Sequence, residues 1–350
     1  MDRVRPQGII PPHILERIAR SDDPQLRGIG GRALASLART EFLRGHRAAI
    51  GAIAALAAVP AGELRRSVHD AGGTEVLPGK LVRSEGQPPV QDVAANEAYD
   101  GAGATDALYR EVFGRASIDD RGMRLVSTVH FGKQYDNAFW DGRQMVYGDG
   151  DGVLFNRFTA ALDVIGHELT HGVTQCEARL RYDGQSGALN ESFSDVFGSL
   201  VKQRALKQSA GDADWLIGEG LFTARVKGRA IRSMREPGTA YDDPTLGKDP
   251  QPGHMDGFVE TADDNGGVHI NSGIPNRAFC LAATAIGGAA WERAGRVWYV
   301  VLRDRLRPDA QFRDAAQATT DVAASLYGAD SREVRAVRDA WATVGIKLTP

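Results

Sequence analysis

Two segments near the middle of the chain carry the apolar spacing of amphipathic helices. In the first, residues 159–178, apolar side chains recur every three or four positions, at Leu162, Ile165, Leu169 and Val173. In the second, residues 187–206, the same spacing runs through Phe193, Val196, Phe197, Leu200 and Val201. Such spacing predicts one buried stripe on each helix. The connecting segment RYDGQSG is rich in turn-forming residues, so the two helices are expected to fold back as neighbours.

The first predicted helix carries the pentapeptide HELTH on a face other than its apolar stripe. Its histidines, His167 and His171, are four residues apart and lie on one side of the helix, where both can bind one metal ion. Glu168 follows the first histidine and can reach a water on that metal. This arrangement is typical of zinc hydrolases. The alternative is a pair of core histidines whose nitrogens bind backbone carbonyls.

The second predicted helix offers a third metal ligand. Glu191 and Asp195 lie one turn apart on its polar face, so Glu191 can complete a His, His, Glu site that leaves one position open for water. Asp195 and Asn190 are placed to accept hydrogen bonds from the imidazoles and to orient them. The alternative, an ordinary solvated pair of carboxylates, leaves the HELTH motif upstream without an explanation.

Four longer motifs resemble those of the thermolysin-like zinc metalloprotease family. They are HELTHGV, GALNESFSDVFG, DNGGVHINSG and NAFWDGRQMVYGDGDG, and matching segments run in order from about residue 66 to residue 347. The resemblance implies an α+β fold of the two-lobe zincin type. A β-rich N-terminal lobe is expected over residues 66–158, and the zinc helix with an α-helical C-terminal lobe over 159–350.

The resemblance also implies a role for individual residues. Those it assigns to chemistry are the zinc ligands His167, His171 and Glu191, the general base Glu168, the oxyanion donors Tyr182 and His269, and Asp264, which orients His269. Those it assigns to the substrate are Asn137, Ala138 and Arg232 for the backbone, and Phe155, Phe158, Val164, Ile217 and Ile231 for an apolar pocket.

The function implied is that of a zinc-dependent neutral endopeptidase that hydrolyses peptide bonds by a metal-activated water. Burial of one Leu or Phe side chain in the apolar pocket supplies about 1.5–3 kcal/mol, so proteins and peptides are expected to be cut before large hydrophobic residues. One alternative is a latent or inactive zinc-binding protein of the same fold. Replacement of Glu168, Tyr182 or His269 would favour it, and all three are present. A second alternative is an aminopeptidase, which needs an acidic group for the free amine.

The N-terminal segment differs from the rest of the chain in charge. Residues 1–70 hold eleven arginines, no lysine and seven acidic residues. Residues 1–65 resemble the short propeptide of the protealysin-like subgroup, which implies a self-processing precursor whose arm acts as an intramolecular inhibitor. Pro11 and Pro12 fix an extended backbone, so Ile14 and Leu15 are expected to dock at the substrate site, with self-cleavage between about Arg44 and Val68. The alternative is a helical subdomain without a regulatory role.

The chain departs from the family at the calcium sites. Asp163, Asp214 and Glu219 match calcium-binding positions, but Lys202 stands where members with two calcium ions have a glutamate, and Leu216 replaces another acid. A lysine ammonium can supply the charge of a cation. The expectation is therefore zinc as the cofactor, with one calcium ion at most.

Charge and composition exclude several other classes of protein. The net charge of -3 argues against nucleic acid or an anionic membrane as a partner. Cys176 and Cys280 are the only cysteines, which excludes a disulfide framework and leaves one bridge between them as the alternative to two free thiols. The apolar run 48–59 is too short to span a bilayer, and the N-terminus lacks the apolar region of a signal peptide. Secretion is expected by resemblance alone, and a cytoplasmic stage before export is compatible with the sequence.

Overall fold

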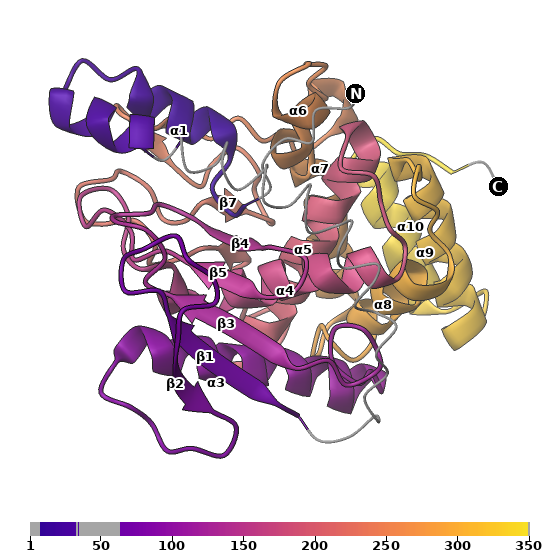
Figure 1. Ribbon diagram of the computed structural model, residues 1–350. Coiled ribbons are helices and arrows are strands. Elements are labelled where there is room, and N and C mark those ends of the chain that lie inside the picture. Colours follow the sequence, from indigo (N-terminus) through magenta and orange to yellow (C-terminus); the bar gives the residue numbers. More distant parts are fainter. Residues whose placement is uncertain (1–7, 33, 35–63, 349–350) are drawn as a thin grey trace.

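The computed structural model describes residues 8–32, 34 and 64–348 of the chain. Its first half after the arm holds a sheet, and its second half is mostly helical (Figure 1). The two long central helices are α4 (Leu162–Cys176) and α5 (Gly184–Ala205), and they lie between the sheet and the last helices of the chain. The helices predicted over 159–178 and 187–206 are thus confirmed, as is the α+β fold.

The sheet has five strands in the order β2-β1-β3-β5-β4. Their bounds are Arg66–Asp70 for β1, Lys80–Ser84 for β2, Leu125–Val129 for β3, Ala138–Trp140 for β4 and Met145–Tyr147 for β5. The pairs β1–β3 and β3–β5 are parallel, whereas β1–β2 and β4–β5 are antiparallel. Strand β4 therefore forms one edge of the sheet. Because an edge strand has unpaired backbone groups, it can accept a further extended segment.

Helix α3 (Val93–Ala107) packs between this sheet and α4. Its first turn is capped by Asp92, whose carboxylate accepts hydrogen bonds from the backbone N–H groups of Ala94 and Ala95. It continues into the short π-helix η1 (Leu108–Val112). There the hydroxyl of Tyr109 and that of Thr170 on α4 are 2.9 Å apart, a buried contact that ties the zinc helix to the N-terminal half.

The C-terminal half adds five helices and two small hairpins among the described residues. The helices are α6 (Asp264–Asn271), α7 (Gly273–Ile286), α8 (Ala294–Asp304), α9 (Phe312–Tyr327) and α10 (Arg332–Thr343). The hairpins pair β6 (Leu216–Ile217) with β7 (Arg232–Ser233), and β8 (Asp242–Asp243) with β9 (Gly247–Lys248). Two short 3-10 turns are η2 (Phe158–Ala160) and η3 (Met255–Gly257). The thiols of Cys176 and Cys280 are both free.

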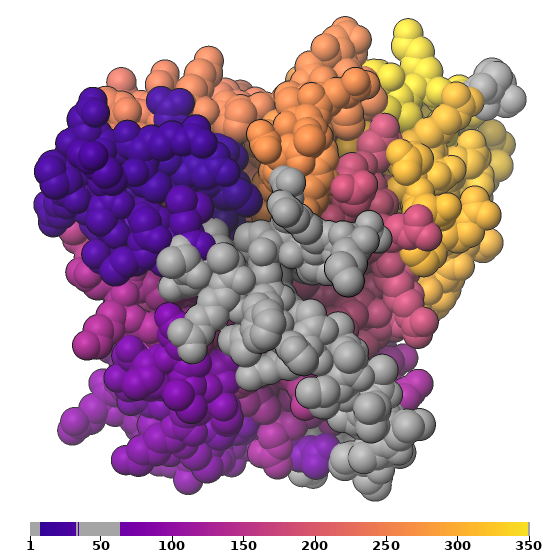
Figure 2. Space-filling model, turned by 45° about the horizontal axis from the view of Figure 1, so that its top comes forward, coloured from indigo at the N-terminus to yellow at the C-terminus, as the bar shows by residue number. Residues whose placement is uncertain are grey.

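The N-terminal arm is placed over residues 8–32 and 34. It begins with the extended residues 8–11, continues as α1 (Pro12–Ala19), and is helical again over residues 24–32. Gly30 lets the second helical stretch approach the first, since a Cβ at Gly30 would lie only 2.2 Å from the backbone nitrogen of Ala19. Figure 2 shows the arm, in indigo, lying against orange and magenta parts of the surface that are distant from it in sequence.

None of the described helices combines the length and the apolar character that a bilayer-spanning segment requires.

Candidate active site

The close approach of α4 and α5 creates the site. A Cβ on Gly198 of α5 would lie 2.3 Å from the carbonyl oxygen of Asp163 and 2.9 Å from the backbone nitrogen of His167. On the facing helix, a Cβ on Gly166 would lie 3.0 Å from the Cα of Gly198. Only glycine fits at Gly198, so the two helix backbones touch there. This contact brings Glu191, two turns earlier on α5, beside the histidines of α4.

His167, His171 and Glu191 form a metal-binding cluster. The Nε2 atoms of the two histidines are 3.0 Å apart, and they lie 3.6 and 3.4 Å from the carboxylate oxygens of Glu191. All three side chains are buried, and they are the one group of this kind among the residues that the structure places. Burial alone would raise the pKa of Glu191, but the histidines His269 and His171 outweigh it and lower that pKa to about 2. Glu191 is therefore ionised, as a metal ligand must be.

The outer nitrogens of the two imidazoles are held by α5. Nδ1 of His167 lies 2.8 Å from Oδ1 of Asp195, and Nδ1 of His171 lies 2.8 Å from Oδ1 of Asn190. With protons on Nδ1, both Nε2 lone pairs face each other across 3.0 Å, an arrangement that a shared cation stabilises. The donor set of two imidazoles and a carboxylate fits zinc. Ser194, which the sequence analysis missed, is a second partner of His171, with its Oγ 3.1 Å from Nδ1.

Asp195 also binds Arg232 of β7. The guanidinium donates to both oxygens of the carboxylate through Nε and Nη2, each at 2.8 Å. Burial by itself would raise the pKa of Asp195, but Arg232 and His167 hold it well below its usual range. The side-chain amide of Asn276 donates to the same carboxylate at 2.8 Å. Asn276 was not foreseen from the sequence, because it lies far along the chain and in no recognisable motif.

Glu168 is buried beside the metal-binding cluster and is held from the sheet. Its Oε2 accepts a hydrogen bond of 2.9 Å from the backbone N–H of Trp140, at the end of β4. Every residue except proline has a backbone N–H, so no sequence motif could indicate this donor. The bond fixes the carboxylate next to His167 through an uncharged donor.

Tyr182 and His269 lie together on the other side of Glu191. The Tyr182 hydroxyl donates a short hydrogen bond to Glu191 and is 3.2 Å from Nε2 of His269. Nδ1 of His269 is 2.6 Å from Oδ1 of Asp264, whose Oδ2 accepts the backbone N–H of His269 at 2.8 Å. Burial alone would lower the pKa of His269, but Asp264 and Glu191 outweigh it and raise that pKa to about 9.

The kinked start of α6 makes the double contact of Asp264 with His269 feasible. Asp264, Asn265, Gly266 and Gly267 all have positive φ, between 51° and 82°. This left-handed backbone folds the carboxylate of Asp264 back over the first turn that carries His269. Glycine tolerates that region at no steric cost, whereas Asp264 and Asn265 adopt it under strain.

The residues of the predicted apolar pocket are all buried. Phe155, Phe158, Val164 and Ile217 have no exposed surface, and Ile231 has 1%. The ring centroids of Phe155 and Phe158 are 6.0 Å apart, and Ile217 of β6 pairs with Arg232 of β7. The five side chains belong to one continuous apolar cluster, which also contains Ile9 of the arm.

The arm binds to the three residues that the sequence analysis assigned to the substrate backbone. The N–H of Ile9 donates to the carbonyl of Ala138 at 3.2 Å, and the carbonyl of Ile9 accepts from Nη1 of Arg232 at 3.1 Å. The N–H of Ile10 donates to Oδ1 of Asn137 at 3.1 Å. These contacts are made by Ile9 and Ile10, not by the expected Ile14 and Leu15. The latter two are buried within α1, because the prolines begin a helix there.

Comparison with known proteins agrees with this geometry. Residues 66–175 match the catalytic domain of thermolysin metallopeptidases, and residues 178–346 match their alpha-helical domain. The chain belongs to the thermolysin family of metallopeptidases. Thermolysin-family enzymes are neutral zinc endopeptidases, so the chain is a metalloendopeptidase with zinc as its cofactor.

Individual relatives extend the similarity to the arm. An extracellular metalloprotease of Pectobacterium carotovorum subsp. carotovorum is 50% identical over 341 residues, which are 97% of this chain and 96% of that protein. Protease PrtS of a Photorhabdus species is 54% identical over 288 residues, 81% of this chain and 77% of that one. The structure of the precursor of protealysin from Serratia proteamaculans matches with a TM-score of 0.88 and 50% identity, over 97% of this chain and 99% of that chain.

The predicted calcium-binding residues of this thermolysin-family chain surround a lysine. Nζ of Lys202 lies 2.9 Å from Asp214, 3.3 Å from Asp163 and 3.6 Å from Glu219, and also 3.3 Å from the carbonyl oxygen of Leu216. Burial alone would lower the pKa of Lys202, but Asp163 and Asp214 outweigh it and raise that pKa above its ordinary value. The ammonium therefore stays charged and binds the oxygens that a calcium ion would need.

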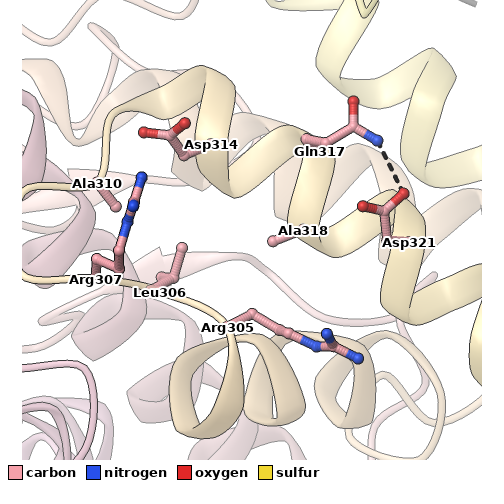
Figure 3. Close-up of a pocket in the computed structure, with 8 residues that line it drawn as sticks. All are labelled: Arg305, Leu306, Arg307, Ala310, Asp314, Gln317, Ala318 and Asp321. Carbon is pink, nitrogen blue, oxygen red and sulfur yellow. Dashed lines mark hydrogen bonds between the residues drawn. The ribbon is translucent and has the colours of Figure 1, made fainter.

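A hollow in the helical half lies apart from these residues. It has a volume of about 290 Å³ and lies between α9 and the connection that precedes it (Figure 3). Its lining is Arg305, Leu306, Arg307, Ala310, Asp314, Gln317, Ala318 and Asp321. None of them is a predicted site residue, and we assign this hollow no role.

Proposed function

We propose that the chain is the self-processing precursor of an endopeptidase that cuts before large hydrophobic residues. The observation that carries the proposal is the hydrogen bonding of the arm residues Ile9 and Ile10 to Asn137, Ala138 and Arg232, beside a His, His, Glu cluster. A segment of the chain itself thus lies where an extended substrate is expected. The named relatives are also proteases, and this disfavours the alternative of an inactive zinc-binding protein.

The catalytic roles are proposed as follows. His167, His171 and Glu191 would hold the zinc, which when bound would supply a Lewis acid that lowers the pKa of water and polarises a carbonyl group. Glu168, oriented by the Trp140 N–H, takes the proton of that water and delivers it to the leaving amine.

Two further side chains are proposed to act on the developing charge. Tyr182 and His269 donate hydrogen bonds to the oxyanion, where one donor is worth about 3 kcal/mol. Asp264 fixes the ring of His269 through Nδ1. Asp195 and Asn190 orient the two metal-binding imidazoles.

Substrate binding is proposed to use both the sheet edge and the apolar cluster. Asn137, Ala138 and Arg232 hold the peptide backbone by the bonds that Ile9 and Ile10 now make. The side chain after the cut enters the pocket of Phe155, Phe158, Val164, Ile217 and Ile231. Because every lining side chain is apolar, a charged residue there would lose its hydration without a partner.

Latency is proposed to follow from competition between the arm and substrate. The arm is tethered to the catalytic part, so its effective concentration reaches the millimolar range and weak contacts suffice to exclude substrate. Activation then needs a cut in the connection, between about Arg44 and Val68. Most of that segment lies outside the described residues.

We propose the organisation and location that the sequence indicated. The arm takes residues 1–65, the β-rich lobe 66–158, and the zinc helix with the helical lobe 159–350. Secretion is supported by the name of the relative from Pectobacterium carotovorum subsp. carotovorum, an extracellular metalloprotease. At the calcium positions we propose that Lys202 takes the place of the ion.

The proposed function is tested with wild type and Glu168→Gln. Wild type should hydrolyse casein, lose activity with a zinc chelator and regain it with zinc, and its chain should shorten with time. Glu168→Gln should bind zinc with the stoichiometry of wild type, stay at full length and lose about 10²–10⁴-fold in rate. Wild-type turnover by Glu168→Gln would remove Glu168 from the role of base.

A further inference from the structure

The arm crosses the site in the direction of a substrate. Ile9 pairs with Ala138 and Ile10 with Asn137, so the arm residue number rises as the strand residue number falls. The backbone bond to β4 is the one from Ile9, and the bond from Ile10 goes to the side chain of Asn137, which precedes β4, so the arm runs opposite to the strand. Ile9 has both its N–H and its carbonyl engaged, the carbonyl by Arg232. On the proposed role of Arg232, Ile9 is the residue that follows the scissile bond.

Gly8 allows the chain to pass so close to β4. A Cβ at Gly8 would lie 2.8 and 2.9 Å from the amide atoms of Asn137 and 3.0 Å from the carbonyl oxygen of Ala138. The contacts with Asn137 require its amide group or the arm to shift, and the one with the Ala138 carbonyl is tighter than an ordinary contact. Gly8 therefore lies against the same groups that bind Ile9 and Ile10.

We propose that the enzyme cuts its own arm at the Gly8–Ile9 bond, within one molecule and before the arm is released. This inference rests on the proposed function and adds a self-modification site to it. Ile9 satisfies the expected preference for a large apolar residue after the cut. Its side chain is fully buried.

The reaction needs only water. The water oxygen bonds to the carbonyl carbon of Gly8 as the C–N bond to Ile9 breaks. Glu168 takes a proton from the water and passes it to the nitrogen of Ile9. The second proton of the water ends on the same nitrogen, so residues 1–8 leave with a new carboxylate and Ile9 becomes an ammonium terminus.

The remainder of the arm stays bound after this cut. The imidazole Nε2 of His13 is 3.0 Å from the hydroxyl of Tyr241. Arg32 donates to the side chain of Gln134 at 3.0 Å, and Arg225 lies 3.4 Å from Asp23. None of these contacts involves residues 1–8, so the new N-terminus at Ile9 remains in the site as a tethered product. The cut therefore precedes activation and does not cause it.

The test follows the intact mass of the full-length protein after zinc is restored to chelated wild type. The first product should lack residues 1–8 and should form at a rate independent of protein concentration, while casein hydrolysis is still low. If the chain first shortens within 44–68 and the Gly8–Ile9 bond stays intact, the inference is overturned. A rate that rises with protein concentration overturns the claim that the cut is intramolecular.

Two glycine variants distinguish the close contacts of Gly8 with Asn137 and Ala138 from a general effect of substitution in the arm. Gly8→Ala should slow the first cut by about tenfold, because its Cβ meets Asn137 and Ala138. Gly31→Ala is the control, since a Cβ there meets nothing within 4 Å. If Gly8→Ala and Gly31→Ala make the first cut at equal rates, the register that places Ile9 after the scissile bond is overturned.

The two proposals can fail separately. Casein hydrolysis by the shortened enzyme, without a Gly8–Ile9 cut, would overturn this inference and leave the proposed function standing. If neither casein hydrolysis nor the Gly8–Ile9 cut occurs, this inference and the proposed function are both overturned.

Discussion

Arg232 and Asp195 form a buried bidentate ion pair that connects the arm to a metal-binding histidine. Arg232 also donates to the carbonyl of Ile9, and Asp195 also accepts a hydrogen bond from Nδ1 of His167. A change in what Arg232 binds can therefore reach His167 through a single carboxylate.

Replacement of Arg232 by lysine should affect both substrate binding and zinc binding. Lysine keeps the charge but cannot bind Asp195 through two parallel bonds and the substrate carbonyl at once. Loss of one charged hydrogen bond, worth about 1.5–3 kcal/mol, should lower kcat/KM by about 10–150-fold, and zinc affinity should fall about tenfold. Kinetics of a peptide substrate and zinc titration measure the two effects. Arg229→Lys, at an exposed neighbour, is the control, and unchanged kcat/KM in Arg232→Lys would refute the role.

The spacing of α4 and α5 should depend on Gly198. A methyl group there would lie 2.3 Å from the carbonyl oxygen of Asp163, so the helices must separate. Overpacking of this kind costs about 1–3 kcal/mol, and Gly198→Ala should bind zinc more weakly because Glu191 moves away from the histidines. Thermal unfolding with and without zinc measures both. Gly211→Ala, whose Cβ meets only the Ser209 hydroxyl at 3.7 Å, should behave as wild type.

Calcium should not stabilise wild type through the acidic cluster around Lys202. In Lys202→Met the carboxylates of Asp163, Asp214 and Glu219 lose their cation, which should cost about 3–5 kcal/mol. Millimolar calcium should restore part of the lost Tm in this variant alone. Lys207→Met, at an exposed site, is the control. Equal calcium responses in wild type and Lys202→Met would show that the lysine does not replace the ion.

Acid should weaken the docking of the arm through His13. Burial, with smaller contributions from His269, Arg17 and Arg232, outweighs the opposite effect of Asp264 and lowers the pKa of His13 to about 4 from 6.5. A docked pKa below the free value means that docking favours the neutral ring. Its contribution is complete above pH 6.5 and is lost as pH falls toward 4.

The measurement is the initial activity of the intact precursor divided by that of the shortened enzyme at each pH. This ratio cancels the pH dependence of catalysis itself. In wild type this ratio should rise on the order of tenfold as pH falls from about 7 to 5, because docking lowers the pKa of His13 from 6.5 to about 4. His13→Asn should show a flat ratio. A flat ratio in wild type would contradict this account of His13.

The metal-binding cluster was predictable because its ligands lie on two strongly periodic helices. A spacing of four residues fixes His167 and His171 on one face, and the turn-rich connection brings Glu191 to them. Of the groups that escaped prediction, Ser194 lies on α5 beside the predicted Asp195, and the others act through the main chain or from distant segments. The Trp140 N–H that orients Glu168 exists for any residue type, and Asn276 reaches Asp195 only in the folded chain.

Which apolar residues of the arm bind the site could not be predicted from the sequence. The apolar residues Ile9, Ile10, Ile14 and Leu15 are all buried, so apolarity alone could not say which of them meets the site. The choice is made by backbone hydrogen bonds, which extended residues can offer to an edge strand and helical residues cannot. Residues 12–19 form α1 and use their N–H groups internally. The extended residues before them are left to bind Ala138 and Asn137.

The arm is bonded to both sides of the site, through Ala138 and Gln134 toward the sheet and through Arg225 and Tyr241 toward the helical half. On the proposed latency, the arm therefore acts as a strap between the two halves as well as an obstacle to substrate. Any motion that separates the halves must break contacts on one side of the strap. We expect that loss of the arm removes these cross-links and opens the site to substrate at the same moment.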